Sequence, residues 1–391
     1  MATASGGIAA ANLKGHTMHS SVGLGINQIR LPVHIMKPSE KLRAKWDPVI
    51  CVVGRVVNDR HRLLRIVGRS FAKTQGQQRA FRGLLAVFMF DFFQLLTVRG
   101  TPLFKKDDPR IPYTGLQAHG AQLYQSIDKA VYLTQNMRVT DDPEWGAWLE
   151  KARMGDWVPQ LRAFLRQAAP PPAEGIHGRF VQVVSTDNAF RKHVNDAAIL
   201  TACQKLMPTR KVYAIPAQLP VAITAGKMTQ VTTMPDSQTG NIAAFLKIYI
   251  GMSVRVKSYQ CIPKGVANGA ANTIFHIDWR TATTFQRKED NVWIASAPPT
   301  NIYVKIDSNA TSTRFPGTPM EWSALIMPIL QSRTSFKLRR ESISIKGFPI
   351  VPAFGITVHG VQGDTIDHIV ISDLRSPHCR TVDRHALYVS L

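Results

Sequence analysis

The stretch from Ala353 to Asp367, AFGITVHGVQGDTID, places the strongest constraint on how this chain can fold. An apolar run leads into Thr357 and His359, and a Gly-Val-Gln-Gly turn follows at residues 360–363. Two glycines in such a turn let a ligand approach the backbone closely, and Thr357, His359 and Gln362 add hydrogen-bond donors and acceptors. This combination suits a phosphate or a nucleic-acid backbone. The simpler interpretation is a strand, a turn and a second strand, with His359 as an ordinary surface residue.

Basic residues greatly outnumber acidic ones. Lys plus Arg is 48 and Asp plus Glu is 26, so the formal net charge is 48 − 26 = +22. Such an excess predicts a polyanionic partner, and nucleic acid is the partner that we favour. A ribosomal protein, a membrane-surface protein and charge drift without selection are the alternatives. A hydrophobic content of 45% over 391 residues indicates a globular chain of two to three domains.

The cysteine pattern excludes a zinc ribbon and argues against a disulfide framework, because no Cys-x-x-Cys spacing occurs. The four residues, which we interpret as free thiols in a reducing compartment, are Cys51, Cys203, Cys261 and Cys379. No apolar run approaches the roughly 18 residues that span a bilayer. The N-terminus also lacks the basic and then apolar pattern of a secretory signal. We therefore expect a cytosolic or nuclear protein that does not enter membranes.

Continuous β-branched runs predict buried strands of parallel sheets. One such run is Val49–Val53, and another lies within residues 179–186. Residues 118–130 have a helical period, and we expect a short strand at Val131–Leu133. The sequence AAPPP at Ala168–Pro172 is the predicted linker, so we expect domains at residues 1–168 and 173–391.

Further residues are candidates for supporting structure rather than chemistry. Asp141-Asp142-Pro143 predicts the start of a helix. Thr186, Asn188 and Asn195 are more simply explained by fold support than by ligand contact. Residues 264–269, with Lys-Gly and Asn-Gly pairs between β-branched runs, predict a hairpin. The segment Asp307–Arg340 is left without an assignment.

Two polar groups in the first half are candidate ligand contacts. Asp91 and Gln94 follow an apolar strand, and α/β sheets place their ligand sites at the carboxyl ends of strands. Arg138 follows the run predicted as a strand at Val131–Leu133. Its planar guanidinium is well suited to phosphate, although a surface arginine is the simpler alternative.

These segments, in this order, resemble the motifs of Pif1-like ATP-dependent DNA helicases of superfamily 1B. Asp91–Leu95 and Gly100–Phe104 resemble G-D-F-F-Q-L-P-P-V-x-G-x-P-L-[FY]. Thr357–Thr365 resembles T-[IV]-H-K-x-Q-G-x-T, with Gly360 in place of the lysine. Thr17–Ser20 resembles T-[IM]-H-S, and the segment that ends at Arg138 resembles L-x-x-N-x-R.

The resemblance implies an α/β fold of tandem RecA-like domains, the first incomplete, with an SH3-like β insertion around residues 255–345 of the second. It implies ATP and Mg²⁺ as cofactors and DNA as partner, single-stranded or at single/double-strand junctions. It further implies a monomer in the nucleus, or alternatively in mitochondria, that acts in DNA repair, recombination and telomere maintenance. The implied site residues are Asp91, Gln94 and Arg138 for catalysis; Gln94, Arg138, Gln362 and Gly363 for ATP; and Thr17, His19, Ser20, Thr357 and His359 for DNA.

The sequence departs from this family at the catalytic positions. No Gly-Lys-Ser/Thr phosphate loop is present, and the chain stops after Leu387–Leu391, where the family continues to an arginine. Gly54 and Arg55 stand where the family has an Asp-Glu pair that holds Mg²⁺ and orients water. We therefore expect no ATP hydrolysis from this chain alone. A non-catalytic single-stranded DNA binder, and a decaying remnant without a stable fold, are the alternatives.

Overall fold

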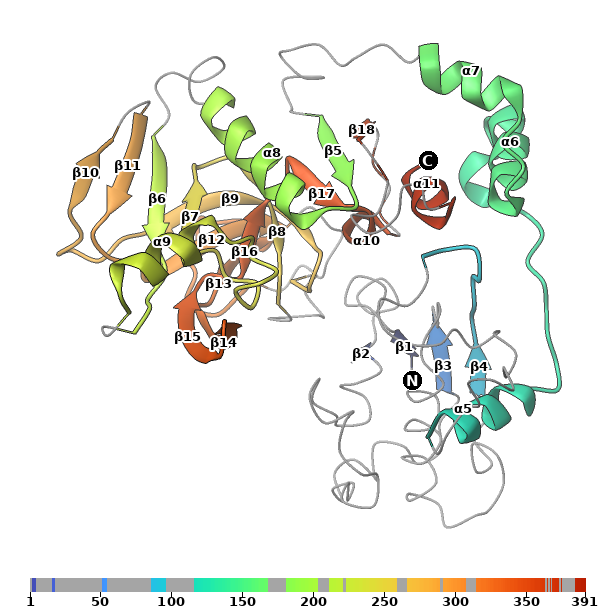
Figure 1. Cartoon of the computed structure of the whole chain (residues 1–391), viewed down its shortest axis with the longest axis horizontal. Coiled ribbons are helices and arrows are strands. Elements are labelled where there is room, and N and C mark those ends of the chain that lie inside the picture. The colour runs from blue at the N-terminus through green and yellow to red at the C-terminus, as the bar shows by residue number, and fades with distance from the viewer. Residues whose placement is uncertain are drawn as a thin grey trace. The chain divides into compact units, whose positions relative to one another are not determined.

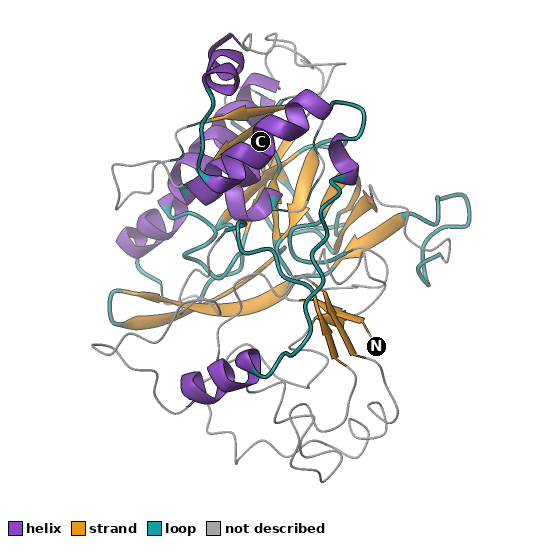
Figure 2. Cartoon of the chain, turned by 90° about the vertical axis from the view of Figure 1, so that its right-hand side faces the viewer, coloured by secondary structure: helices purple, strands orange, loops and turns teal. Residues whose placement is uncertain are grey.

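The computed structural model describes secondary structure for about two thirds of the chain (Figures 1 and 2). The described residues are 2–4, 16–17, 51–54, 86–95, 116–167, 181–202, 211–220, 223–258, 266–288, 291–306, 314–362, 364, 366, 368–372, 374 and 384–391. In these ranges no helix is both long and apolar enough to cross a bilayer. The predicted linker Ala168–Pro172 lies outside the described residues.

The chain divides into two compact units. The first comprises residues 1–168 together with 383–389 and 391, and the second comprises residues 169–382 and 390. The chain therefore leaves the first unit, builds the second and then returns to the first with its last helix. Each unit has its own sheets and its own core, so each is described by itself.

The first unit contains a four-stranded parallel sheet in the order β2-β1-β3-β4. Its strands are β1 (Ala2–Ala4), β2 (His16–Thr17), β3 (Cys51–Gly54) and β4 (Ala86–Phe88). The strand predicted at Val49–Val53 is confirmed as β3, shifted slightly toward the C-terminus. Because the strands are parallel, the residues that follow β3 and β4 leave the sheet at the same edge.

Four helices of seven to twelve residues lie in the described part of the first unit. They are α5 (Leu116–Gln125), α6 (Pro143–Met154), α7 (Pro159–Gln167) and α11 (Arg384–Ser390), and a 3-10 turn lies at Met137–Val139. The predicted start of α6 is confirmed, since Asp142 accepts a 3.0 Å hydrogen bond from the Trp145 amide and Pro143 is the first helical residue. A small core of Ala152, Val158 and Leu161 joins α6 and α7, and the C-terminal Leu391 packs against it.

The strand predicted at Val131–Leu133 is wrong. These residues have no regular secondary structure, and their side chains are 85–88% exposed. A strand needs a neighbouring strand to bind its backbone groups and a core to cover its side chains. Neither is present around these residues in the described part of the unit, so local β propensity does not suffice.

A three-stranded parallel sheet in the order β17-β5-β18 forms one part of the second unit. Its strands are β5 (Gln182–Ser185), β17 (Gly355–Thr357) and β18 (Ile369–Ile371), and helix α8 (Asn188–Thr201) packs against β5 and β17. Helix and strand approach so closely that a Cβ atom at Gly355 would lie 2.8 Å from the Arg191 carbonyl oxygen. Glycine is therefore required at the start of β17.

A second sheet of this unit is mixed. Its order is β10-β11-β6-β7, in which β11 and β6 are parallel and the outer pairs are antiparallel. The strands are β6 (Val212–Pro216), β7 (Phe245–Ile248), β10 (Phe285–Arg287) and β11 (Val292–Ala295), and helix α9 (Ala225–Thr233) follows β6.

The third sheet of the second unit is antiparallel, in the order β13-β12-β9-β8-β16. Its strands are β8 (Ser253–Val256), β9 (Ala271–Asp278), β12 (Asn301–Ile306), β13 (Ile326–Ile329) and β16 (Ile350–Pro352). The hairpin β14 (Ser332–Leu338) and β15 (Glu341–Gly347) lies between β13 and β16 in sequence. The predicted β8–β9 hairpin is confirmed, with Gly269 in the left-handed conformation at its turn.

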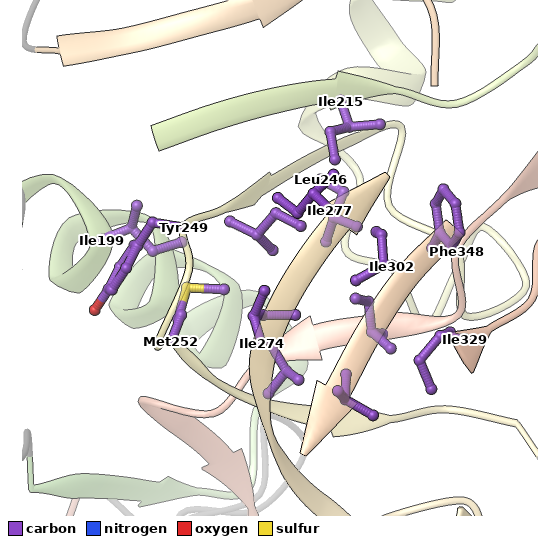
Figure 3. Close-up of a cluster of buried hydrophobic side chains, with 14 of the residues drawn as sticks. Ile199, Ile215, Leu246, Tyr249, Met252, Ile274, Ile277, Ile302, Ile329 and Phe348 are labelled. Atoms are coloured by element: carbon purple, nitrogen blue, oxygen red, sulfur yellow. The ribbon is translucent and has the colours of Figure 1, made fainter. Parts of the chain in front are cut away.

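One large hydrophobic core joins these elements (Figure 3). Ile199 of α8 and Leu246 of β7 contribute to it together with Ile274 of β9 and Ile302 of β12. All four side chains are at most 4% exposed. The core therefore connects the helix that covers the parallel sheet to the antiparallel strands around residues 253–352. The expected α/β class, with a β insertion in the second half, is confirmed.

Candidate functional site

The residues after β4 form a tight turn that we call the Asp91–Gln94 turn. One Asp91 oxygen accepts a 3.1 Å hydrogen bond from the Phe93 amide, and the other accepts a 2.9 Å bond from the Gln94 side-chain amide. Aspartate closes turns in this way because its short side chain reaches the backbone two residues ahead. The structure thus brings the predicted residues Asp91 and Gln94 together, and Asp91 orients Gln94.

Arg153 of α6 contacts the same turn and was missed by the sequence interpretation. Its Nη2 lies 3.7 Å from Asp91 Oδ1, and its guanidinium carbon lies 4.6 Å from the centre of the Phe93 ring. Burial alone would lower the pKa of Arg153, but the hydrogen bond to Glu150 and the charges of Asp91 and Glu150 outweigh burial and raise that pKa. Only the tertiary fold reveals this contact, since Asp91 and Arg153 are 62 positions apart (153 − 91).

Helix α11 contacts the turn from the C-terminal end of the chain. The buried His385 places Nδ1 2.8 Å from the Phe93 carbonyl oxygen, 292 positions away in sequence. The Asp91–Gln94 turn is therefore held by two helices, α6 and α11, in addition to its own internal hydrogen bonds.

The described residues at this edge of the sheet do not fit a Mg²⁺ site. Strand β3 ends at Gly54, which has no side chain to offer, and Arg55 lies outside the described residues. The Asp91 oxygens already accept from Phe93 and Gln94 and face the Arg153 guanidinium. A metal ion there would compete with a cation that is already in place.

The second candidate group, the Thr357–Gln362 turn, follows β17. Thr357 ends the strand, helix α10 (Val358–Val361) makes one helical turn, and Gln362 follows it. In this turn Val358 and Val361 are buried and His359 is exposed. Thr357 and Gln362 are half-buried. The alternation arises because the buried side chains lie three residues apart on one helical face. The three predicted polar side chains thus remain at or near the surface.

Arg255 of β8 supports this turn and was also missed by the sequence interpretation. Its Nη1 donates to the Gly269 carbonyl at 2.9 Å, to the Gly360 carbonyl at 3.1 Å and to the Asp364 carboxylate at 2.5 Å. An arginine in a β-branched strand looks like a surface residue in the sequence. Its neighbours Val254 and Val256 do not distinguish it from a surface arginine, since Ser253 and Lys257 flank them.

Fold support, the role expected of Asn195, is confirmed. Its side-chain amide donates to the Gly355 carbonyl at 3.2 Å, and its side-chain oxygen accepts from the Gly355 amide at 2.7 Å. Asn195 is buried, so these two bonds fasten α8 to β17 immediately before the Thr357–Gln362 turn. Asn188 accepts a hydrogen bond from Arg191 within α8.

Several predicted site residues cannot be compared with the structure. His19, Ser20 and Gly363 lie outside the described residues, as do the side chains of Thr17 and Arg138. The backbone of Thr17 ends strand β2, which pairs with β1. The Asp91–Gln94 turn belongs to the first unit and the Thr357–Gln362 turn to the second, so their expected convergence on one nucleotide stays a prediction.

A parallel sheet in each unit, with a polar turn after β4 and another after β17, defines the class: an α/β protein with RecA-like domains. Residues 1–163 match the family model described as PIF1-like helicase. Over 179 residues the chain is 28% identical to the ATP-dependent DNA helicase PIF1 of Emericella nidulans. That match covers 43% of this chain and 22% of the fungal protein, so the chain corresponds to a minor part of that relative.

Solved structures of similar fold cover nearly the whole chain. The Pif1 helicase of Candida albicans matches with a TM-score of 0.64 and 17% identity, over 99% of this chain and 80% of that one. Bacteroides Pif1 bound to ssDNA matches with a TM-score of 0.59 and 18% identity, over 100% and 79%. Bacteroides Pif1 in complex with ADP-AlF3 and ssDNA matches with a TM-score of 0.60 and 18% identity, over 100% and 79%. Residues 1–163 thus resemble PIF1-like helicases in sequence, and the whole chain resembles solved Pif1 helicases in fold.

Proposed function

We propose that this chain is a DNA helicase of the Pif1-like family that binds single-stranded DNA, or single/double-strand junctions, through its Thr357–Gln362 turn. The observation that carries the proposal is the geometry of that turn. It follows a parallel strand, exposes His359 and keeps Thr357 and Gln362 accessible, while Val358 and Val361 anchor it in the core. Hydroxyl, imidazole and amide groups are common partners of phosphate and sugar oxygens.

The net charge of +22 supports a nucleic-acid partner for the chain as a whole. The related Bacteroides protein has been solved bound to ssDNA. The same proposal includes a role in DNA repair, recombination and telomere maintenance. It also includes a nuclear or mitochondrial location and a monomeric state.

We further propose that this chain hydrolyses ATP poorly or not at all by itself. Phosphoryl transfer needs a bound Mg²⁺ and stabilisation of the transferred charge. Strand β3 ends at Gly54, and Asp91 is paired with Arg153 and Gln94. Gln94 and Arg138, with Gln362 and Gly363 from the second unit, are the residues that we propose to contact ATP when it binds.

A non-catalytic single-stranded DNA binder is the second candidate function. The contacts of Asp91 favour it, because this carboxylate already pairs with Arg153 and accepts a hydrogen bond from Gln94. The two candidates share DNA binding and differ in ATP turnover and strand separation, so they are distinguished by measuring all three on one preparation.

DNA binding is tested by fluorescence anisotropy with a labelled oligo-dT at increasing salt. We expect binding that weakens at least about tenfold between about 50 and 200 mM salt, because phosphate contacts release counterions. His359→Ala should weaken binding several-fold, whereas His368→Ala, an exposed histidine of the same unit, is the matched control. Binding that is absent, or equally affected by both variants, would exclude the turn as the DNA contact.

Catalysis is tested by phosphate release and by unwinding of a forked duplex, each with ATP and Mg²⁺. We expect little or no phosphate release; slow release that DNA stimulates would favour the impaired helicase, and release at the background rate with and without DNA would favour the non-catalytic binder. Robust ATP hydrolysis that DNA stimulates would show that the proposed catalytic impairment is wrong and that the chain is an active helicase. Salt-dependent binding without hydrolysis would favour the non-catalytic binder.

A further inference from the structure

Arg255 lies inside the second unit and yet reaches the Thr357–Gln362 turn. Only 5% of the residue is exposed, and it projects from β8 in the antiparallel sheet. Its Nη1 joins three segments: the Gly269 turn between β8 and β9, the Gly360 carbonyl of α10, and the Asp364 carboxylate. One guanidinium therefore connects the antiparallel β sheet to the turn that follows the parallel strand β17.

The Arg255–Asp364 contact is an ion pair withdrawn from water. Their side chains are 6% and 15% exposed. Removing one partner of such a pair leaves an uncompensated charge in the protein interior, which is far more disruptive than losing a surface pair. Asp364 therefore requires Arg255 as its partner, and the Asp364 amide also donates a 2.9 Å hydrogen bond to the Val361 carbonyl of α10.

The backbone at Gly360 lies close to the residues that precede it. A Cβ atom at Gly360 would lie 3.0 Å from Ile356 Cγ2 and 3.3 Å from Thr357 Oγ1. The glycine thus fits closely against the residues that precede it, while its carbonyl oxygen is held by Arg255. Arg255 thus holds the Gly360 carbonyl, and the Thr357 hydroxyl lies close to the same residue.

We propose that Arg255, through Asp364 and the Gly360 carbonyl, positions the Thr357–Gln362 turn for nucleic acid. This inference rests on the proposed DNA-binding function. Arg255 is a positioning residue and does not contact the nucleic acid, since it is buried beneath the turn. Because it stands in β8, the antiparallel β sheet sets the orientation of His359 and Gln362, and any rearrangement of that sheet changes the DNA contact.

The matched control is a second buried ion pair in the same unit. Arg191 of α8 pairs with Asp236, and both residues are buried, at 3% and 6% exposure. No contact between either residue and residues 357–362 occurs in the described contacts of this pair. Asp236→Asn therefore removes a charge from a comparable environment without touching the turn.

The experiment compares Asp364→Asn, Arg255→Lys and Arg255→Met with Asp236→Asn, each as the full chain. Affinity for a labelled oligo-dT and amide hydrogen exchange of residues 355–362 are measured on every variant. We expect Asp364→Asn and Arg255→Met to weaken binding by about tenfold, with faster exchange in the turn. Arg255→Lys keeps the charge and should recover part of the affinity. Asp236→Asn leaves Arg191 unpaired and should lower the free energy of unfolding, while both readouts for the turn stay close to those of the wild type.

Unchanged affinity in Asp364→Asn and Arg255→Met would overturn the proposal. Weaker binding without faster exchange in residues 355–362 would also overturn it, because the turn would then be in place. The same is true if Asp236→Asn reproduces both effects, which would indicate general destabilisation. If the wild type fails to bind oligo-dT, the proposed function is wrong, and the exchange measurement alone decides whether Arg255 holds the turn.

Discussion

The guanidinium of Arg153 lies over the ring of Phe93, with 4.6 Å between its carbon and the ring centre. This contact fastens helix α6 to the turn after β4, whose Asp91 faces the same guanidinium. A cation above an aromatic ring is attracted by its negative face. The turn that carries Gln94 is therefore held by a residue that no sequence motif identifies.

Arg153→Ala should lower the free energy of unfolding of the first unit by about 1 kcal/mol, since it removes a partly exposed ion pair, a cation–π contact and packing. Urea unfolding measures the change. Lys151→Ala, an exposed residue on the same helix, is the control and should have a negligible effect. Equal losses in both variants would mean that Arg153 contributes only helix propensity.

Asn195→Ala should destabilise the second unit by about 2–4 kcal/mol, because it leaves the buried amide and carbonyl of Gly355 without their side-chain partner. Chemical denaturation followed by circular dichroism gives the value. Lys192→Ala, on the same helix and half-exposed, should cost no more than about 1 kcal/mol. A small effect at Asn195 would imply that water replaces the lost partner.

Lys257 should make the stability of the second unit depend on alkaline pH. Burial lowers the pKa of Lys257; the charges of Arg191 and Arg255 lower it further, and that of Asp236 opposes them. The unfolded chain thus binds this proton more tightly than the folded one. The contribution of Lys257 to the free energy of unfolding therefore rises with pH. The rise begins at the lowered pKa of the folded state and ends at about pH 10.4, which is the pKa of lysine in an unfolded chain.

The measurement compares wild type with Lys257→Met from about pH 7 to about pH 10, so that other titrating groups cancel. The free energy of unfolding of the wild type should rise relative to that of the variant. A constant difference across this range would show that Lys257 has the same pKa in both states.

Asp142→Ala should cost about 1 kcal/mol through loss of the cap on α6. Asp142 accepts from the Trp145 amide, and Pro143 follows it at the first helical position. Asp141→Ala, one residue earlier and exposed, should change the free energy of unfolding by less than about 0.5 kcal/mol. Thermal unfolding of the two variants side by side separates the cap from a general effect of charge.

Local signals predicted much of the backbone. The β-branched runs became β3 and β5, the Asp142-Pro143 pair starts α6, and Asn268-Gly269 closes the β8–β9 hairpin. Each of these elements depends on residues that are neighbours in sequence, which is why a pattern identifies them. Val131–Leu133 shows the limit, since its β propensity meets no partner strand.

The supports of the two candidate turns could not be predicted. Arg153, His385 and Arg255 reach their turns from 62, 292 and 105 positions away (153 − 91, 385 − 93 and 360 − 255). The motif residues Asp91, Gln94 and Thr357 were found because their chemistry lies within a few positions. Charges that act through tertiary contacts leave no local pattern, and only packing reveals them.

The return of helix α11 to the first unit makes the two halves inseparable by a single break of the chain. A backbone cut between residues 168 and 181 would still leave the C-terminal fragment docked, through Leu391 and His385, on the N-terminal one. The second unit is thus joined to the first by two connections of the chain, one before it and one after it.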